Sequence, residues 1–242
     1  MKDTRDMTAD KKLKRHGGKS DTRSKRIARP STSACEALPA ESIQALRDVI
    51  SRHSSGNPWT NAHVRIRNEV VMQLFLQLGL RRGEVLGIKI PEIHFEENFL
   101  AVGSGPQCSK SRSATQADRQ LPVSDDLIHL IREYICGARS EIKGSKRHDY
   151  LIVSDRTGVP LTNEGLNRVF ETLRKGLPDL LSGLTAHGLR LNWNLEFLRV
   201  MEKRGANEED VRRLRCHYMG WSDLKTADLY DRWRFRDNNR RR

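Results

Sequence analysis

Apolar positions in the first third of the chain recur at the spacing of amphipathic helices. From Glu41 to His53 they stand three or four residues apart, which predicts a short helix. A polar stretch containing Gly and Pro then interrupts the pattern over residues 54–58. Asn61 is a suitable N-cap for a longer helix that reaches about Leu80, and its apolar positions are dense enough for a buried element. Residues 82–88 predict another helical turn or two.

The periodicity changes after Pro91. Residues 93–102 alternate loosely around a polar Glu-Glu-Asn centre, which indicates a β-hairpin. A polar connection over 103–118 leads to a third candidate strand at 119–123. The pattern therefore predicts a small three-stranded antiparallel sheet whose third strand follows a long, flexible connection.

Helical spacing returns in the second half of the chain. We predict helices over 125–136 and 162–177, separated by a basic loop over 137–148 and a brief strand over 150–154. The last third is predicted to be helical, with Gly205 and Gly220 as stops. No internal repeat is present. The fold class that follows is α+β, mainly helical, with one small three-stranded antiparallel sheet.

Most of the positive charge lies at the two ends of the chain. The formal net charge is +13, of which residues 1–32 carry +7 and residues 232–242 carry +5. The 199 residues between them are therefore nearly neutral, at +1. Two basic tails flanking a neutral body are typical of a protein that binds a polyanion such as nucleic acid. The alternative is a soluble domain with unstructured ends.

The cysteines and the apolar runs argue against several other classes of protein. The four cysteines are scattered, without a CxxC pair or a histidine pair at metal-ligand spacing, so we expect neither a zinc site nor a disulfide framework. The first residues lack an apolar signal region, and glutamines break the most apolar run. We therefore expect a cytoplasmic protein without a membrane partner.

Side chains suited to phosphate chemistry gather between residues 185 and 230. His187 and Arg190 stand three positions apart, and Tyr230 follows Trp221 by nine positions. An imidazole, a guanidinium, an indole N–H and a phenol can together bind a phosphate and exchange protons with it. This segment is the first candidate for an active site.

Four short motifs stand in a fixed order along the chain. They are Gly79-Leu80-Arg81-Arg82-Gly83-Glu84, His187-Gly188-Leu189-Arg190, Met219-Gly220-Trp221, and Tyr230 preceded by Thr226. In order and spacing they resemble the catalytic domain of the tyrosine recombinase (phage integrase) family, over roughly residues 61–233. Each motif alone is weak, but all four in sequence make a chance match improbable.

The resemblance implies that two arginines stabilise the phosphate during cleavage of DNA. Attack on a phosphodiester adds negative charge to its nonbridging oxygens. Arg81 and Arg190 would answer that charge, because a guanidinium stays protonated and presents planar, bidentate donors. Glu84 would support the site by orienting an arginine rather than by contacting DNA.

The remaining roles implied by the resemblance concern the nucleophile and the protons. Tyr230 would attack the phosphate, and its phenol has an ordinary pKa of ~10, so it needs assistance near neutral pH. His187 would act as a general base or hydrogen-bond the phosphate, and Trp221 would position a phosphate oxygen through its single N–H. Lys110, the only lysine between residues 90 and 142, is the candidate for the hairpin lysine that protonates the leaving 5′ oxygen.

The implied function is that of a site-specific recombinase or integrase of a mobile element. Such an enzyme would cleave and rejoin double-stranded DNA through a covalent 3′-phosphotyrosine, as a homo-oligomer (a tetramer) on the DNA. It would need no metal, no other cofactor and no small-molecule substrate. Two alternatives stay open: strand passage like that of a type IB topoisomerase, and a non-catalytic DNA-binding remnant of a recombinase.

The expected organisation departs from that of the family in one respect. Full recombinases carry a separate helical domain that clamps the far side of the duplex. We expect a disordered basic arm over residues 1–37, then only a short helix and linker over 38–60, without a complete core-binding domain. The catalytic domain would cover 61–233, and a basic tail would cover 234–242. Leu191 also stands where a second histidine often follows the His-x-x-Arg motif.

Overall fold

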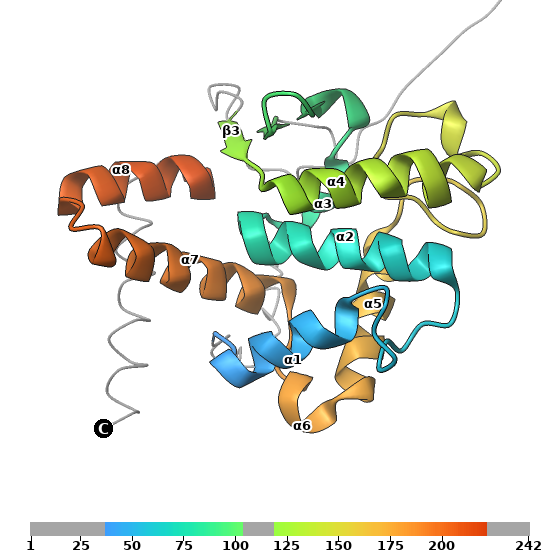
Figure 1. Cartoon of the computed structure of the whole chain (residues 1–242), viewed down its shortest axis with the longest axis horizontal. Helices are drawn as coiled ribbons and strands as arrows, with labels where there is room; N and C mark the ends of the chain where they lie inside the picture. The colour runs from blue at the N-terminus through green and yellow to red at the C-terminus, as the bar shows by residue number, and fades with distance from the viewer. Residues whose placement is uncertain (1–36, 104–118, 222–242) are drawn as a thin grey trace, which may run out of the picture. The chain divides into compact units, whose positions relative to one another are not determined.

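The computed structural model describes residues 37–103 and 119–221, and in these ranges helices dominate (Figure 1). The α-helices are α1 (Ala40–Ile50), α2 (Ala62–Leu78), α3 (Arg82–Gly87), α4 (Asp125–Tyr134), α5 (Asn163–Gly176), α6 (Pro178–Leu181), α7 (Ala186–Lys203) and α8 (Glu208–Met219). The strands are β1 (Ile93–His94), β2 (Phe99–Val102) and β3 (Arg119–Pro122). Shorter helical turns are η1 (Ile90–Glu92), η2 (Ile135–Arg139) and η3 (Ser145–Arg147). The mainly helical α+β class is thus confirmed.

Helix α2 is the centre of the packing. The Asn61 side chain caps it by accepting hydrogen bonds from the N–H groups of His63 and Val64, as predicted. Gly79 ends it in the left-handed conformation, φ 58°, one residue before the predicted end at about Leu80. The helix packs against α1, α4 and α7, so most of its residues are buried. Because the helix is surrounded on three sides, its apolar residues are spread around most of its circumference and do not form a single stripe.

The predicted three-stranded antiparallel sheet is present, in the order β1-β2-β3. Ile93 pairs with Leu100, and Leu100 in turn pairs with Leu121. All three side chains are buried, which places one face of the sheet against the core. Because side chains alternate along a strand, Arg119 lies on the same buried face as Leu121. Of the predicted connection over 103–118, residues 104–118 lie outside the described residues.

Two local predictions were wrong. Residues 150–154 form no regular strand; Tyr150 and Val153 make only isolated bridges, to Lys89 and Pro160. The predicted loop over 137–148 begins and ends in the helical turns η2 and η3. The buried Arg139 guanidinium donates to the carbonyls of residues 145, 148 and 150, and these hydrogen bonds hold the segment around the arginine.

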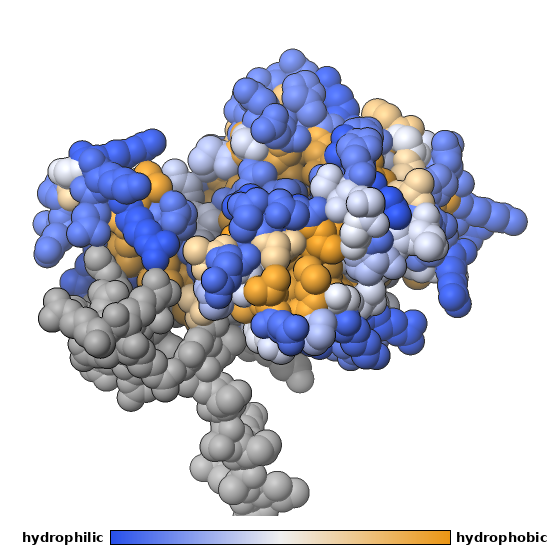
Figure 2. Space-filling view, turned by 60° about the horizontal axis from the view of Figure 1, so that its bottom comes forward, coloured by the Kyte–Doolittle hydropathy of each residue, from blue (hydrophilic) through white to orange (hydrophobic). Residues whose placement is uncertain are grey.

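The side of the molecule that carries α1 and α6 is turned toward the viewer in Figure 2, where an apolar area is bordered by hydrophilic residues. A groove of about 270 Å³ is lined by residues of α1, α2 and α7 and by the segment just before α1, among them Leu38, Ile43, Leu76, Leu189 and Trp193. None of the predicted site residues lines this groove. No helix within the described ranges is long and apolar enough to cross a membrane.

The carbonyl cluster around Arg139 yields a prediction about stability. Arg139→Gln should lower the free energy of unfolding by about 2–4 kcal/mol, because three carbonyls, one of them on the buried Ser145, lose their charged donor. Urea unfolding followed by circular dichroism measures the change. Arg132→Gln is the matched control, since this arginine lies at the surface and its ion pair with Glu96 is exposed. Equal stability of the two variants would contradict the prediction.

Candidate active site

A buried carboxylate, that of Glu84, lies at the centre of the predicted site. Glu84 is the third residue of α3, and its carboxylate accepts a hydrogen bond from the backbone N–H of Arg81, 2.7 Å away. This bond caps the first turn of α3. The side chain is only 1% exposed. A carboxylate so deeply buried requires cations or other donors around it.

Three guanidinium groups surround this carboxylate. Arg119 donates to both of its oxygens, from Nη1 at 3.1 Å and from Nη2 at 2.9 Å. Nη1 of Arg81 lies 2.9 Å from Oε1, and Nη1 of Arg190 lies 4.0 Å from Oε2. The arginines come from positions 81, 119 and 190, so the carboxylate joins α3, β3 and α7 at one point.

The charges around Glu84 govern its ionisation. Burial by itself would raise the pKa of this carboxyl. The hydrogen bond from Arg119 and the charges of Arg119, Arg81 and Arg190 outweigh burial and lower the pKa from 4.5 to about 2. Glu84 is therefore ionised throughout the neutral range, and the cluster of three arginines and one carboxylate keeps a net positive charge.

The two predicted phosphate-binding arginines differ in exposure. The Arg81 side chain is 41% exposed, and its Nη2 donates to the carbonyl of Gly220 at 3.0 Å. The Arg190 side chain is 4% exposed; its Nη1 donates to the carbonyl of Gly79 at 2.6 Å and its Nη2 to that of Met219. Arg81 is thus open to a ligand, whereas Arg190 ties the end of α2 to the end of α8.

His187 lies in the first turn of α7, three residues before Arg190. The Thr185 hydroxyl caps this helix by accepting a hydrogen bond from the N–H of Gly188, 2.9 Å away. His187 is at the surface, but its ring is partly desolvated. That desolvation, together with the positive charge of Arg190, lowers its pKa from 6.5. The imidazole is consequently neutral at pH 7 and able to accept a proton.

Gly220 closes α8 and leads directly into Trp221. It adopts φ 57°, and the N–H groups of Gly220 and Trp221 donate to the carbonyls of His217 and Cys216, both at 3.0 Å. A Cβ at Gly220 would stand 2.4 Å from Nη1 of Arg119. Glycine is therefore required here for two reasons, its conformation and the close approach of an arginine.

Trp221 is half-buried, and its ring is 5.5 Å from the guanidinium carbon of Arg215 on α8. A cation over an aromatic face at this distance holds the ring in place. Sequence reasoning missed both Arg215 and Arg119. The signal for Arg119 was present, because strand alternation puts it beside Leu121 on the buried face, where an arginine needs an acidic partner.

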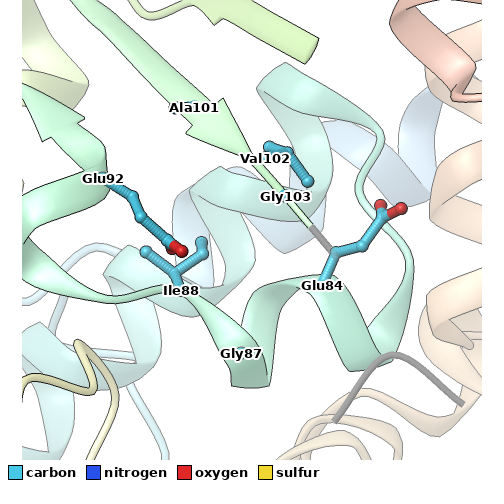
Figure 3. Close-up of a pocket in the computed structure, with 7 residues that line it drawn as sticks. All are labelled: Glu84, Gly87, Ile88, Glu92, Ala101, Val102 and Gly103. Atoms are coloured by element: carbon cyan, nitrogen blue, oxygen red, sulfur yellow. The ribbon is translucent and has the colours of Figure 1, made fainter. Parts of the chain in front are cut away.

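The structure thus brings Arg81, Glu84, Arg190 and Trp221 to one place, with His187 on the same helix turn as Arg190. Lys110 and Tyr230 lie outside the described residues, as does Thr226. Within the described ranges no group of three or more His, Cys, Asp or Glu residues could hold a metal ion. A small pocket between α3 and the end of β2 has room for about one water molecule, with Glu84 and Glu92 at its opposite ends (Figure 3).

The sequence pattern of the phage integrase family matches residues 36–236 of the chain. This match covers most of the chain and includes all of the motifs described above. The chain belongs to the phage integrase family. The match begins before α1, whose residues Leu46 and Ile50 are buried in the same core as α2.

Known members of the family resemble the chain at moderate identity. It is 23% identical over 196 residues to the tyrosine recombinase XerD of Halalkalibacterium halodurans, covering 81% of this chain and 56% of that protein. It is 28% identical over 173 residues to XerD of Oceanobacillus iheyensis, covering 70% and 51%. The chain spans about half the length of these curated relatives. The crystal structure of XerA recombinase has the same fold, with a TM-score of 0.61 and 18% identity over 89% of this chain and 66% of that one.

The lowered pKa of Glu84 makes part of the stability dependent on pH. Its folded-state pKa is depressed, so the contribution is present above the unfolded value of 4.5 and is lost as pH falls toward about 2. The shift corresponds to about 3 kcal/mol. We expect Glu84→Gln to be about 3–5 kcal/mol less stable than the wild type at pH 7, because the buried Arg119 loses its partner.

This difference between Glu84→Gln and the wild type should shrink as pH falls from 5 to 2, measured by urea unfolding at each pH. Glu96→Gln is the control, since the Glu96 side chain is 88% exposed. A difference that stays constant with pH would show that Glu84 is not held ionised by its arginines.

The close approach of Arg119 to Gly220 is tested by adding a methyl group. Gly220→Ala should be less stable than the wild type by more than the ~1–2 kcal/mol that a left-handed alanine costs, because the new Cβ also displaces Arg119. Gly205→Ala supplies the matched control: Gly205 has a similar φ of 64°, and a Cβ there would meet no atom within 4 Å. Thermal unfolding of both variants gives the comparison. The contact with Arg119 is unimportant if the two lose equal stability.

Proposed function

We propose that the chain is the catalytic domain of a site-specific tyrosine recombinase that cleaves and rejoins DNA through Tyr230. The observation that carries this proposal is the convergence of Arg81 and Arg190, which stand more than a hundred positions apart, on one buried carboxylate, with Arg81 also bound to the carbonyl of Gly220, the residue before Trp221. We place the catalytic domain at residues 61–233, with the arm over 1–37, the short helix and linker over 38–60 and the tail over 234–242 as adjoining parts.

The proposed reaction begins with binding of a DNA phosphate beside Arg81. The exposed guanidinium offers donors to a nonbridging oxygen, and the buried arginines add positive charge behind it. Trp221 donates its indole N–H to a second oxygen. These contacts orient the phosphate and leave one of its sides accessible to the nucleophile.

Cleavage is then a transfer of the phosphate from one oxygen to another. The neutral imidazole of His187 accepts the phenol proton as the Tyr230 oxygen bonds to phosphorus. The bond from phosphorus to the 5′ oxygen breaks, and Lys110 gives that oxygen its proton. The product is a 3′-phosphotyrosine, which conserves the energy of the phosphodiester. A 5′ hydroxyl of a partner strand reverses the steps and rejoins the DNA.

Double-stranded DNA is the proposed substrate, and the basic ends of the chain are its proposed phosphate contacts. Residues 1–32 and 232–242 carry +7 and +5, a charge that attracts DNA without regard to sequence. Exchange of strands between two sites needs two cleavages on each duplex. A homo-oligomer, a tetramer of this chain, is therefore the proposed assembly on DNA.

The proposal predicts a covalent adduct that depends on a single tyrosine. The wild type, mixed with a pool of end-labelled nicked duplexes of random sequence, should form a protein–DNA adduct that survives SDS, because the nick lets the 5′ end diffuse away. Tyr230→Phe should form none. Tyr218→Phe is the matched control; this tyrosine lies twelve residues earlier and packs its ring near Trp193 and Phe197. It should retain the adduct.

Three other outcomes would count against the proposal. Binding of the pool without any adduct indicates a non-catalytic DNA-binding protein. An adduct that persists in Tyr230→Phe assigns the nucleophile elsewhere. Relaxation of a supercoiled plasmid without exchange of strands indicates a topoisomerase.

A further inference from the structure

Arg119 is a second buried link between the elements of the site, beside Arg190. Its side chain is 5% exposed, and two of its nitrogens bind the two oxygens of Glu84 in the planar, bidentate geometry of a strong ion pair. It is the first residue of β3 and follows Lys110 by nine positions. In the reaction described above Arg119 adds only positive charge behind Arg81; no phosphate contact and no proton transfer falls to it, although it is about as buried as Arg190.

One oxygen of Glu84 fixes two arginines relative to each other. Oε1 accepts from Nη1 of Arg81 at 2.9 Å and from Nη1 of Arg119 at 3.1 Å. Two guanidinium groups this close repel each other, and the shared carboxylate oxygen offsets that repulsion. The position of the exposed Arg81 guanidinium therefore depends on how Arg119 turns the carboxylate.

Arg119 also lies against Gly220 at the end of α8. Its Nη1 lies so close to Gly220 that a Cβ there would be 2.4 Å away, and the Gly220 carbonyl accepts the hydrogen bond from Nη2 of Arg81. The next residue is Trp221. A single buried side chain of β3 thus contacts both the carboxylate that holds Arg81 and the glycine that precedes Trp221.

We propose that Arg119 is a positioning residue for phosphate cleavage: by holding Glu84 and Gly220, it sets the placement of the Arg81 guanidinium relative to Trp221. The inference rests on the proposed recombinase function, and it goes further by assigning part of the rate to a residue that does not touch DNA. A misplacement of about 1 Å in such a group costs about 100-fold in rate.

The test compares the wild type with Arg119 variants in single-turnover cleavage of a nicked duplex at saturating protein. The duplex is one that the wild type has selected from the random pool. Arg119→Gln should cleave about 10- to 100-fold more slowly than the wild type, with an apparent DNA affinity within about threefold, since the Arg119 side chain is buried. Arg119→Lys should recover part of the rate, because an ammonium can hold one carboxylate oxygen but not both.

A substrate with an uncharged phosphate analogue distinguishes a misplaced Arg81 guanidinium from a general loss of structure as the cause of slower cleavage. A methylphosphonate at the scissile position lacks the negative charge that Arg81 answers, so its cleavage should depend far less on where that guanidinium stands. We expect the ratio of wild-type to Arg119→Gln rates to fall from about 10–100 on the phosphate to about threefold or less on the methylphosphonate. Arg139→Gln is the control for a buried arginine whose partners are backbone carbonyls away from the site, and it should affect both substrates equally.

The outcomes distinguish this inference from the function on which it rests. If the wild type forms no adduct with any duplex, the proposed function fails and the inference fails with it. If the wild type cleaves and Arg119→Gln cleaves at the same rate, only the inference fails. An equal loss on phosphate and methylphosphonate would also overturn it, because that result means that Arg119 serves the fold alone.

Discussion

The buried charge of Glu84 is the constraint on which the rest of the site depends. An ionised carboxylate that is 1% exposed is tolerated only if cations and hydrogen-bond donors replace the water that it has lost. One donor is local, the N–H of Arg81 at the start of α3, and the others must arrive by tertiary folding. Bringing Arg119 and Arg190 to this carboxylate fixes where β3 and α7 stand relative to α3.

The same constraint explains why the cluster suits an anionic substrate. Three guanidinium groups against one carboxylate leave an excess of positive charge in a site partly shielded from water. Arginines would repel one another if they were gathered without the carboxylate, and they would be neutralised if each had its own acid. One shared acid lets them crowd together while the exposed Arg81 still has charge to offer.

Much of the fold could be predicted from local patterns. Helices α2 and α4 and the three-stranded sheet follow from apolar spacing, and Asn61 and Gly220 mark helix ends by capping chemistry that acts over a few residues. The failures lie where a distant side chain competes with the backbone ladder. The carbonyl of Tyr150 accepts from Arg139 rather than from a neighbouring strand, and nothing in residues 150–154 themselves predicts that partner.

The predicted site shows the same division between local and tertiary information. Motif spacing identified Arg81, Glu84, Arg190 and Trp221, and the structure brings them together. Motif spacing could not reveal which of these arginines is exposed, nor that β3 contributes a third arginine. Arg119 is separated from Glu84 by 35 positions, so its pairing depends on the register of β2 with β3. Spacing identifies residue types that chemistry needs, whereas burial decides which of them can meet a substrate.

The burial of Arg190 changes how its proposed contribution should be understood. Both of its terminal nitrogens donate to backbone carbonyls, of Gly79 and Met219, so its side chain joins two helix ends. A charge need not touch a phosphate to stabilise it. At ~6 Å and an effective dielectric constant of ~20, one guanidinium still contributes about 3 kcal/mol to the interaction with a unit negative charge. Arg190 therefore fixes the helix ends that lead to Arg81 and Trp221, and under the proposed function its charge would also strengthen the field around the phosphate.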